Sequence, residues 1–599
     1  MILQALKEYY DRKAADPESG IAPLGFEHKE LPFVIVIGAD GRFVNLEDTR
    51  GAKERRMVGH VYLVPRSRTR TGPKSHQTTF LLWDHSGYLL DHPADNDRAH
   101  LQHQSWLASL ATLPESLKAD AGVAAVLMFY AKGGVTAVKA APNWKDCADL
   151  PTCNMTFRLA GDAEPVPCRE TVRNHVRQTV QVSRDEDDEA DVKTVIGRCL
   201  VTGDREEIAR VHGRTPISKD SKSLVGIQTN CGYDSYGKQR GYNAPVGKTA
   251  EFAYVTALNA LLKSNRSRMK VGDVTTVFWA AKHTDTGFED IFGDLWTDDP
   301  DRSTEAVRSL FKSPQTGAFV TDDDTTRFYV LGLAPNVARI AVRFWIADTV
   351  AHMAARIRQH FEDTTIVHRT GDQETLSLDR LLRSTALQED RENIPPNLGG
   401  DTMRAILEEL PYPQTLLQAV IRRVRAEQSK KDKRTGTSVS NVSYPRAALI
   451  KACVNRETRR NKNNKEEELT VSLDETNTNI GYRLGRLFAA LEKIQQDAHS
   501  GINATIRDKF YGAASSTPVT VFGNLMRLSN HHLSKLERDK PGLAVVRKQL
   551  VQDIMCGVPD FPAHLALADQ GRFAIGYYHQ TQRFFEKKAD AATSKEEQQ

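Results

Sequence analysis

The spacing of apolar residues changes along this chain, and that change most constrains its fold. Up to about residue 365 the apolar residues come in short strand-like runs. One is LPFVIVIGADGRFVNLED (31–48), in which Asp40-Gly41 predicts a turn between two strands. After about residue 480 they recur every 3.6 residues, which is typical of amphipathic helices. The pattern predicts an α+β protein: a mixed, β-rich N-terminal region followed by a C-terminal all-α helical bundle.

The 599 residues leave room for several domains, and we expect four segments. Residues 1–215 are a mixed α/β region with a basic loop, and residues 216–365 are an α+β region with a polar loop. Residues 366–479 are a helical region with basic linkers, and residues 480–599 are the helical bundle. Asn477 and Asn479 are plausible helix caps. The apolar stripe of the helix that follows is Ile480, Leu484, Leu487, Phe488, Leu491 and Ile494.

Several shorter elements are also expected. Helices are predicted at the N-terminus (MILQALKEYYDRK) and over 252–262, 519–536, 544–555 and 577–588. Strands are predicted at HVYLVP (60–65), on both sides of Ser86-Gly87 in FLLWDHSGYLLD (80–91), and at VTTVFWA (274–280), RFYVLGL (327–333) and ARIAVRFWI (338–346).

Composition limits the class of protein. The content of 40% hydrophobic and 26% charged residues suits a soluble globular protein. No apolar run approaches the roughly 20 residues of a membrane span, and the N-terminus lacks a signal-peptide pattern. The seven cysteines are scattered and odd in number, which argues against a disulfide framework. We therefore expect a cytoplasmic protein without membrane contact.

The net charge of +4 conceals a segregated distribution. Residues 50–74 hold eight basic residues and one acidic residue, and residues 422–465 hold fourteen basic and three acidic residues. In the second stretch, residues 422–443 are polar and read as a mobile basic connection, and residues 456–468 resemble them. Segregation of this kind favours contact with a polyanion, although solvated loops of a large protein are the alternative.

Two loops stand out as candidate DNA contacts. Arg66, Arg68 and Arg70 alternate, so on an extended segment they would project from one face. The loop at 235–243 holds Tyr236, which could stack on a base or sugar, and amides that could bond base edges. For the loop at 235–243, a purely structural role is the alternative. The predicted DNA contacts are Lys53, Arg66, Arg68, Arg70, Gly72, Lys74, Gln77, Ser235, Tyr236, Lys238, Gln239 and Asn243.

The candidate catalytic motifs in the sequence each lack residues that their chemistry requires. Gly247-Lys248-Thr249 lacks the earlier glycine of a phosphate-binding loop, so it more simply begins a helix. Cys147, Cys153 and Cys168 lack zinc-site spacing and a fourth ligand. Asp322–Asp324 point in different directions, and neither His531-His532 nor His100 and His103 have convergent acids. We expect no catalytic residues, no metal ligands and no cofactor, with a metal-dependent nuclease as the alternative function.

Three long passages, together with the opening MILQALKEYYDR, resemble a known family. They run over Ser235–Leu262, Phe328–Trp345 and Asn479–Leu536, in the order that the family has them. The family is the large subunit of the type I-C CRISPR Cascade surveillance complex.

The resemblance implies a non-catalytic subunit of an RNA-guided DNA-binding assembly. Such a subunit sits at the 5′ end of the crRNA, reads the protospacer-adjacent motif (PAM) in double-stranded DNA, and helps open the duplex. Its C-terminal bundle joins the small subunits along the displaced strand, and that region is also expressed separately as the small subunit. The other implied partners are the Cascade backbone subunits, the crRNA-processing subunit and a helicase-nuclease that degrades the target in antiviral defence.

Base pairing with the guide supplies sequence recognition in such an assembly, so the protein needs PAM contacts and basic surfaces rather than an active site. A displaced single strand is tracked electrostatically. The residues predicted to contact it are Arg459, Arg460, Lys462, Arg483, Arg486, Lys493, Lys535 and Arg538. Asn336 and Arg339 are structural or contact the guide RNA.

Overall fold

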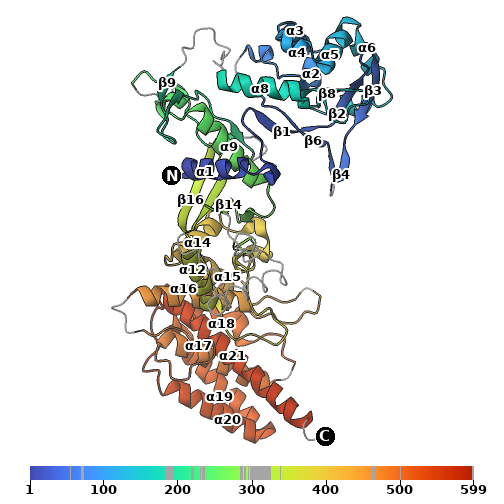
Figure 1. Ribbon diagram of the computed structural model, residues 1–599. Helices are drawn as coiled ribbons and strands as arrows, with labels where there is room; N and C mark the ends of the chain where they lie inside the picture. Colours follow the sequence, from blue (N-terminus) through green and yellow to red (C-terminus); the bar gives the residue numbers. More distant parts are fainter. Residues whose placement is uncertain are drawn as a thin grey trace. The chain divides into compact units, whose positions relative to one another are not determined.

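Figure 1 shows the protein as a computed structural model. The structure describes residues 1–53, 56–68, 70, 73–182, 195–217, 222–229, 231–232, 236–282, 288, 292–293, 296, 326–336, 339–432, 434–461, 466–499 and 501–596. They form two compact units, Met1–Ala260 and Leu261–Gln599. Among the helices of these residues, none is both long and apolar enough to cross a membrane.

A four-stranded mixed sheet organises the first unit. Its order is β3 (Phe43–Asp48), β2 (Phe33–Ile37), β8 (Asn154–Leu159) and β7 (Trp83–His85). β2 and β8 are parallel, and the outer pairs are antiparallel. The predicted turn between β2 and β3 is confirmed. Gly41 there has a φ of 78°, and an added β-carbon would lie 2.6 Å from Met128, so the turn requires glycine.

Residues 86–182 are mostly helical, so the expected β bias is wrong for this part of the first unit. The strand expected after Ser86 is helix α2. The apolar run in α5 is hydrophobic on every face, so it carries no 3.6-residue period from which a buried helix could be predicted. The helices are α2 (Ser86–Leu90), α3 (Asp97–Ala111), α4 (Glu115–Lys118), α5 (Ala121–Ala131), α6 (Gly134–Lys139), α7 (Trp144–Ala148) and α8 (Glu170–Val182).

Among the described residues of the first unit there are also four antiparallel pairs of short strands. They are β1 (Phe26–Leu31) with β6 (His60–Pro65), β4 (Gly51–Lys53) with β5 (Arg56–Val58), β9 (Ile196–Arg198) with β10 (Arg205–Glu207), and β11 (Arg214–Thr215) with β12 (Lys222–Ser223).

Two predicted helices of the first unit are confirmed, α1 (Ile2–Ala14) and α9 (Lys248–Lys263). They meet where the Tyr10 ring packs edge-on against Phe252, with 5.7 Å between the ring centroids. The predicted strand at 60–65 is also confirmed as β6.

An antiparallel sheet begins the second unit. Its order is β13 (Arg268–Val271), β14 (Val274–Ala280), β15 (Arg327–Asn336) and β16 (Arg339–Thr349), which confirms the three strands predicted there. Side chains alternate between its two faces. Trp279, Tyr329 and Trp345 contact one another, with ring centroids 5.4 to 5.7 Å apart, whereas Phe278 and Phe328 enter the hydrophobic core.

Most of the remaining described residues of the second unit are helical. In α17 the side chain of Asn479 accepts a hydrogen bond from the Tyr482 N–H at 3.2 Å, so the predicted cap is confirmed. The bounds are α12 (Val350–Thr364), α13 (Leu378–Arg383), α14 (Leu398–Leu407), α15 (Gln414–Ala426), α16 (Tyr444–Arg460), α17 (Ile480–Ala498), α18 (Ile506–Ala514), α19 (Phe522–Asp539), α20 (Pro541–Met555) and α21 (Leu567–Glu596).

One hydrophobic core runs through the second unit, from Met269 to Tyr578. Helix α21 packs against α16 as well as α17: Gly571 lies close to Ile450 and Val454. The single division of the chain falls at 260/261 rather than at the expected boundaries after residues 215, 365 and 479. Those boundaries stay predictions.

The expectation of a mobile basic connection at 422–443 and 456–468 is wrong at the start of each segment. Residues 422–426 belong to α15, and residues 456–460 belong to α16, the helix that also holds Arg446. Arg446 and Arg456 are buried and pair with Glu427 at 2.8 Å and Asp363 at 3.1 Å. Asp363 lies 93 residues before Arg456, so local charge counting could not have found this pair.

Candidate nucleic-acid interface

Arg66 has a structural role in the first unit, because it contacts helix α9. Its Nη1 and Nη2 donate to the Glu251 carboxylate of α9 at 3.2 Å, and its guanidinium lies 4.9 Å from the centroid of the Phe252 ring. Glu251 is buried and also accepts the Gly213 N–H at 2.7 Å. Arg66 therefore ties the segment after β6 to α9.

Arg70 is likewise engaged. It pairs with the buried Asp84 carboxylate, donates Nε–H to the Thr78 carbonyl at 2.8 Å, and lies 3.8 and 4.0 Å from the centroids of the Phe80 and Tyr88 rings. Burial raises the pKa of Asp84, and the Arg70 charge opposes that rise. The prediction that Arg66, Arg68 and Arg70 project from one face is therefore wrong. Their segment is not a strand, since β6 ends at Pro65.

Of the predicted contacts on this loop, Arg68, Lys74 and Gln77 are exposed. A short 3₁₀ helix (Ser75–Gln77) follows Lys74, and its Ser75 carbonyl accepts from the Tyr88 hydroxyl at 3.1 Å. The Ser75 hydroxyl accepts from Arg98 at 2.6 Å. These three side chains remain candidates on a supported surface. Of the other two predicted contacts, Lys53 ends β4 and Gly72 lies outside the described residues.

The second predicted loop presents an aromatic residue to solvent. Tyr236 is 100% exposed and has a φ of 51°, in the left-handed region that side chains other than glycine seldom adopt. Lys238 and Gln239, which follow it, are also exposed, whereas Ser235 lies outside the described part of the chain. An exposed ring with a cation and an amide beside it can stack on a base while contacting phosphate.

Asn243 supports this loop from within. Its Nδ2 donates to the carbonyls of Lys238 at 3.0 Å and Arg240 at 3.1 Å. Below it the Gly241 N–H donates to the Arg210 carbonyl at 2.9 Å, and a β-carbon on Gly241 would lie 2.3 Å from the Ala209 oxygen. The geometry favours the structural alternative for Asn243 over a base-reading role.

Two arginines beside this loop were missed from the sequence. Arg210 and Arg240 line a cavity of about 240 Å³ together with His212, Ser223 and Gln228. Arg240 lies two positions after Lys238, and its charge could have indicated it. Arg210 comes from a separate segment, so only the fold brings it here.

Asn336 and Arg339 are paired at the free end of the β15–β16 hairpin. Both are exposed, and the two residues between them lie outside the described part. A hairpin end of this kind can reach a neighbouring molecule, so the guide-RNA contact stays a prediction.

The predicted displaced-strand residues divide by their contacts. Arg460 and Arg538 are exposed at the ends of α16 and α19, and Lys462 lies outside the described residues. Four others have partners: Arg459 pairs with Asp363 and Glu468, Arg483 donates to the Asn477 carbonyl, Lys493 pairs with Asp497, and Lys535 lies 3.2 Å from His499.

Arg486 is 5% exposed, and it donates to Gln580 at 3.3 Å and to the Glu475 carbonyl at 3.2 Å. Arg486 lies off the apolar stripe of α17, but helix α21 covers that side of α17, which the period of α17 alone could not reveal.

The phosphate-loop-like motif begins helix α9, as expected. Lys248 pairs with Glu207 at 2.8 Å, and the Thr249 N–H donates to the Glu206 carboxylate at 3.4 Å. A β-carbon on Gly247 would clash with the Glu206 side chain, so carboxylates already occupy this helix N-terminus.

The three cysteines considered for zinc do not form a site. Cys147 and Cys153 are buried with their sulfurs 3.3 Å apart, while Cys168 donates to the Leu63 carbonyl at 3.3 Å. Within the described ranges no group of three or more His, Cys, Asp or Glu residues could hold a metal ion. Asp322–Asp324 lie outside those ranges.

Comparison with known proteins agrees with the whole-chain resemblance. A search of curated proteins finds no match. The family model described as CRISPR-associated protein (Cas_Csd1) matches residues 6–585, which is nearly the whole chain. The chain therefore belongs to the CRISPR-associated Csd1 family, the large subunits of type I-C CRISPR complexes.

Proposed function

We propose that this large subunit recognises the PAM in double-stranded DNA and helps open the duplex without catalysis of its own. In this proposal it stabilises the R-loop with crRNA, Cascade backbone, crRNA-processing and small subunits, and recruits a separate helicase-nuclease. The observation that carries the proposal is Tyr236, a fully exposed ring at the tip of a loop whose base is held by Asn243 and Gly241. An exposed aromatic ring with Lys238 and Gln239 beside it suits insertion at, or stacking on, duplex DNA.

Replacing Tyr236 with Ala in the assembled complex tests this proposal. We expect binding to duplex DNA with the correct PAM to weaken by about 1–3 kcal/mol, which is the usual contribution of one base contact. Binding to a mutated PAM should change little. The matched control is Tyr9→Ala, on a different element of the same unit. An equal loss on both DNAs would leave Tyr236 with a backbone or folding role.

Arg68 and Lys74 are proposed to contact the phosphates flanking the PAM. Changing both to Ala should reduce the slope of log affinity against log salt by about 0.9 for each phosphate that the protein no longer neutralises. Arg42→Ala, at an exposed turn of the same unit, should leave the slope unchanged. An unchanged slope in the double variant would remove this loop from the interface.

Arg460 and Arg538 are proposed to hold the displaced strand. Since exchange of duplex for heteroduplex is nearly balanced, removing both cations should slow R-loop completion on a duplex target. Pairing of the guide with a single-stranded target should be unaffected. Equal impairment on both targets would indicate that the two arginines act in assembly of the complex instead.

Incubating the purified protein with labelled DNA and Mg²⁺ or Mn²⁺ tests the absence of catalysis, because cleavage would favour a nuclease.

A further inference from the structure

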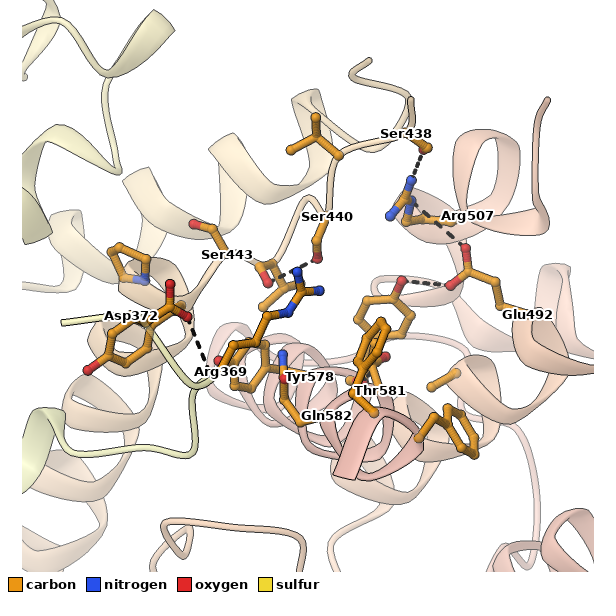
Figure 2. Close-up of a pocket in the computed structure, with 18 of the residues that line it drawn as sticks. Arg369, Asp372, Ser438, Ser440, Ser443, Glu492, Arg507, Tyr578, Thr581 and Gln582 are labelled. Atoms are coloured by element: carbon orange, nitrogen blue, oxygen red, sulfur yellow. Dashed lines mark hydrogen bonds and ion pairs between the residues drawn. The ribbon is translucent and has the colours of Figure 1, made fainter. Parts of the chain in front are cut away.

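The second unit contains a cavity of about 950 Å³ that none of the preceding functions uses. Figure 2 shows it between the segments at 369–380 and 438–445 on one side and helices α17 and α21 on the other, with Arg507 of α18 at its edge. This volume lies at the upper end of the range of small-molecule sites.

The charged side chains that line the cavity are mainly cationic. Four cations, Arg369, Arg380, Lys493 and Arg507, face two carboxylates, Asp372 and Glu492. Lys493 is paired with Asp497 at 2.7 Å. The guanidinium groups of Arg369 and Arg380, by contrast, make no ion pair with any residue that the structure describes. Asp372, whose carboxylate accepts the Arg369 backbone N–H at 3.2 Å, offsets one of these two charges, so the lining of the cavity keeps a net positive charge.

Arg507 is the most deeply buried of these cations, at 6% exposure. In Figure 2 it bonds Ser438 on one side and faces Glu492 on the other, with 4.0 Å between its Nε and Glu492 Oε1. Glu492 already accepts from Tyr577 and Thr505, each at 2.6 Å. The Nε–H of Arg507 has no hydrogen-bond partner among the described residues. Arg507 also lies 3.9 Å from the Asp508 carboxylate, so Glu492 and Asp508 balance its charge, and it shapes the edge of the cavity rather than offering a free cation.

The N-terminus of α16 adds a second donor group. Ser443 is its N-cap, yet the Ser443 hydroxyl caps no backbone N–H and is buried without a partner in the described part of the chain. Pro445 and Tyr444 of the same turn line the cavity. The positive end of a 17-residue helix dipole thus meets the unpaired arginines at one site.

Aromatic rings supply the apolar part of the lining. Tyr444 stacks on His368 with 4.7 Å between centroids, and the Tyr578 hydroxyl donates to the Val367 carbonyl at 2.8 Å. Arg369 lies 4.7 Å from the centroid of the Phe585 ring. The Tyr444 hydroxyl donates to the Glu374 carbonyl at 3.4 Å, so both tyrosine hydroxyls are engaged. His368 and Arg369 lie against the Tyr444 and Phe585 rings, and the faces turned away from them are apolar surfaces of the kind on which a base can stack.

We propose that this cavity binds a nucleotide, with its phosphate held by Arg369, Arg380 and Ser443 and its base against the aromatic rings. The nucleotide is either free or the phosphorylated end of a single strand, which share this chemistry. The site is separate from the PAM-reading loop and does not depend on that assignment.

Calorimetric titration of the purified full-length chain tests the proposal. The probes are AMP, adenosine, inorganic phosphate and a short oligothymidylate with and without a 5′ phosphate. We expect a phosphorylated probe to bind. Its unphosphorylated counterpart should bind at least about tenfold more weakly. AMP binding indicates a free nucleotide. Binding of only the phosphorylated strand indicates a strand end.

The Arg369→Ala, Arg380→Ala double variant should lose about tenfold or more in affinity for that probe. Ser443→Ala should give a smaller loss. A control double variant, Arg404→Ala with Arg527→Ala, removes the same charge elsewhere in the second unit and should bind the probe normally. The Tyr236→Ala variant should also bind it normally. The proposal is overturned if no probe binds, if adenosine binds as well as AMP, or if the first double variant binds like the unchanged protein at an unaltered melting temperature.

Discussion

Individual arginines of this protein differ in role although they look alike in the sequence. Arg70 is 19% exposed and its partner Asp84 is fully buried, whereas Arg68, two positions earlier, is exposed. A buried carboxylate depends on its cation, because removing one partner leaves an uncompensated charge. The same loop therefore combines a structural arginine with a candidate DNA-binding one.

Arg70→Ala should destabilise the protein by about 3–5 kcal/mol, and Arg68→Ala should change the unfolding free energy by less than about 0.5 kcal/mol. Urea unfolding of both variants measures the difference. The loss in Arg70→Ala should be smaller at acid pH. Without Arg70 the pKa of Asp84 rises further, so stability is lost as pH rises through that value. Adding Asp84→Asn should recover part of the loss, and no recovery would contradict the ion-pair explanation.

At the scale of elements, α17 and α21 approach each other closely through glycine. A β-carbon on Gly485 would lie 2.0 Å from the Phe573 oxygen, and one on Gly576 would lie 2.1 Å from the Tyr482 oxygen. Backbone atoms of one helix therefore occupy the space that side chains would need on the other. Close packing of this kind fixes the path of α21, which in turn buries Arg486.

Gly485→Ala or Gly576→Ala should destabilise the second unit by about 1–3 kcal/mol, since the helices must move apart. Gly523 and Gly542, in the first turns of α19 and α20, have nothing within 4 Å of an added β-carbon. Alanine at these two positions should be neutral or stabilise by up to about 1 kcal/mol. Thermal unfolding compares the four variants, and similar melting temperatures would contradict the close approach.

At the scale of the whole molecule, the second unit is held by one core to which the sheet and the C-terminal helices both contribute. A fragment that contains residues 261–599 should therefore unfold in a single transition. Residues 480–599 alone lack Ile450 and Val454 against Gly571, so we expect this fragment to have a lower melting temperature. Circular dichroism on both fragments is the measurement. Equal melting temperatures would support the C-terminal bundle as an independent domain.

Buried histidines should make the second unit sensitive to acid. Burial lowers the pKa of His360 and of His579 to about 3, and the Nε2 of each has no partner among the described residues. The folded state keeps both neutral while the unfolded chain protonates them below pH 6.5. Stability is thus present above pH 6.5 and is lost as pH falls toward 3, by up to about 1.4 kcal/mol per pH unit for each histidine.

His579→Gln should flatten this dependence, whereas His531→Gln, at an exposed position of α19, should not. Urea unfolding at several pH values between 3 and 7 gives the slopes. An unchanged slope in His579→Gln would mean that His579 is not buried as a neutral group.

The sequence by itself determined the α+β order, the strands of the second unit, the capped helix α17 and the family. These depend on local information: residue periodicity, turn and cap residues, and long uncommon passages that can be compared. It failed at α5, because a helix that is apolar on all sides has no polar face to mark its period. Only the tertiary structure decided which cations are available to a nucleic acid. Arg66 meets a carboxylate 185 residues away and Arg456 one 93 residues away, and such partners become neighbours only when the chain folds.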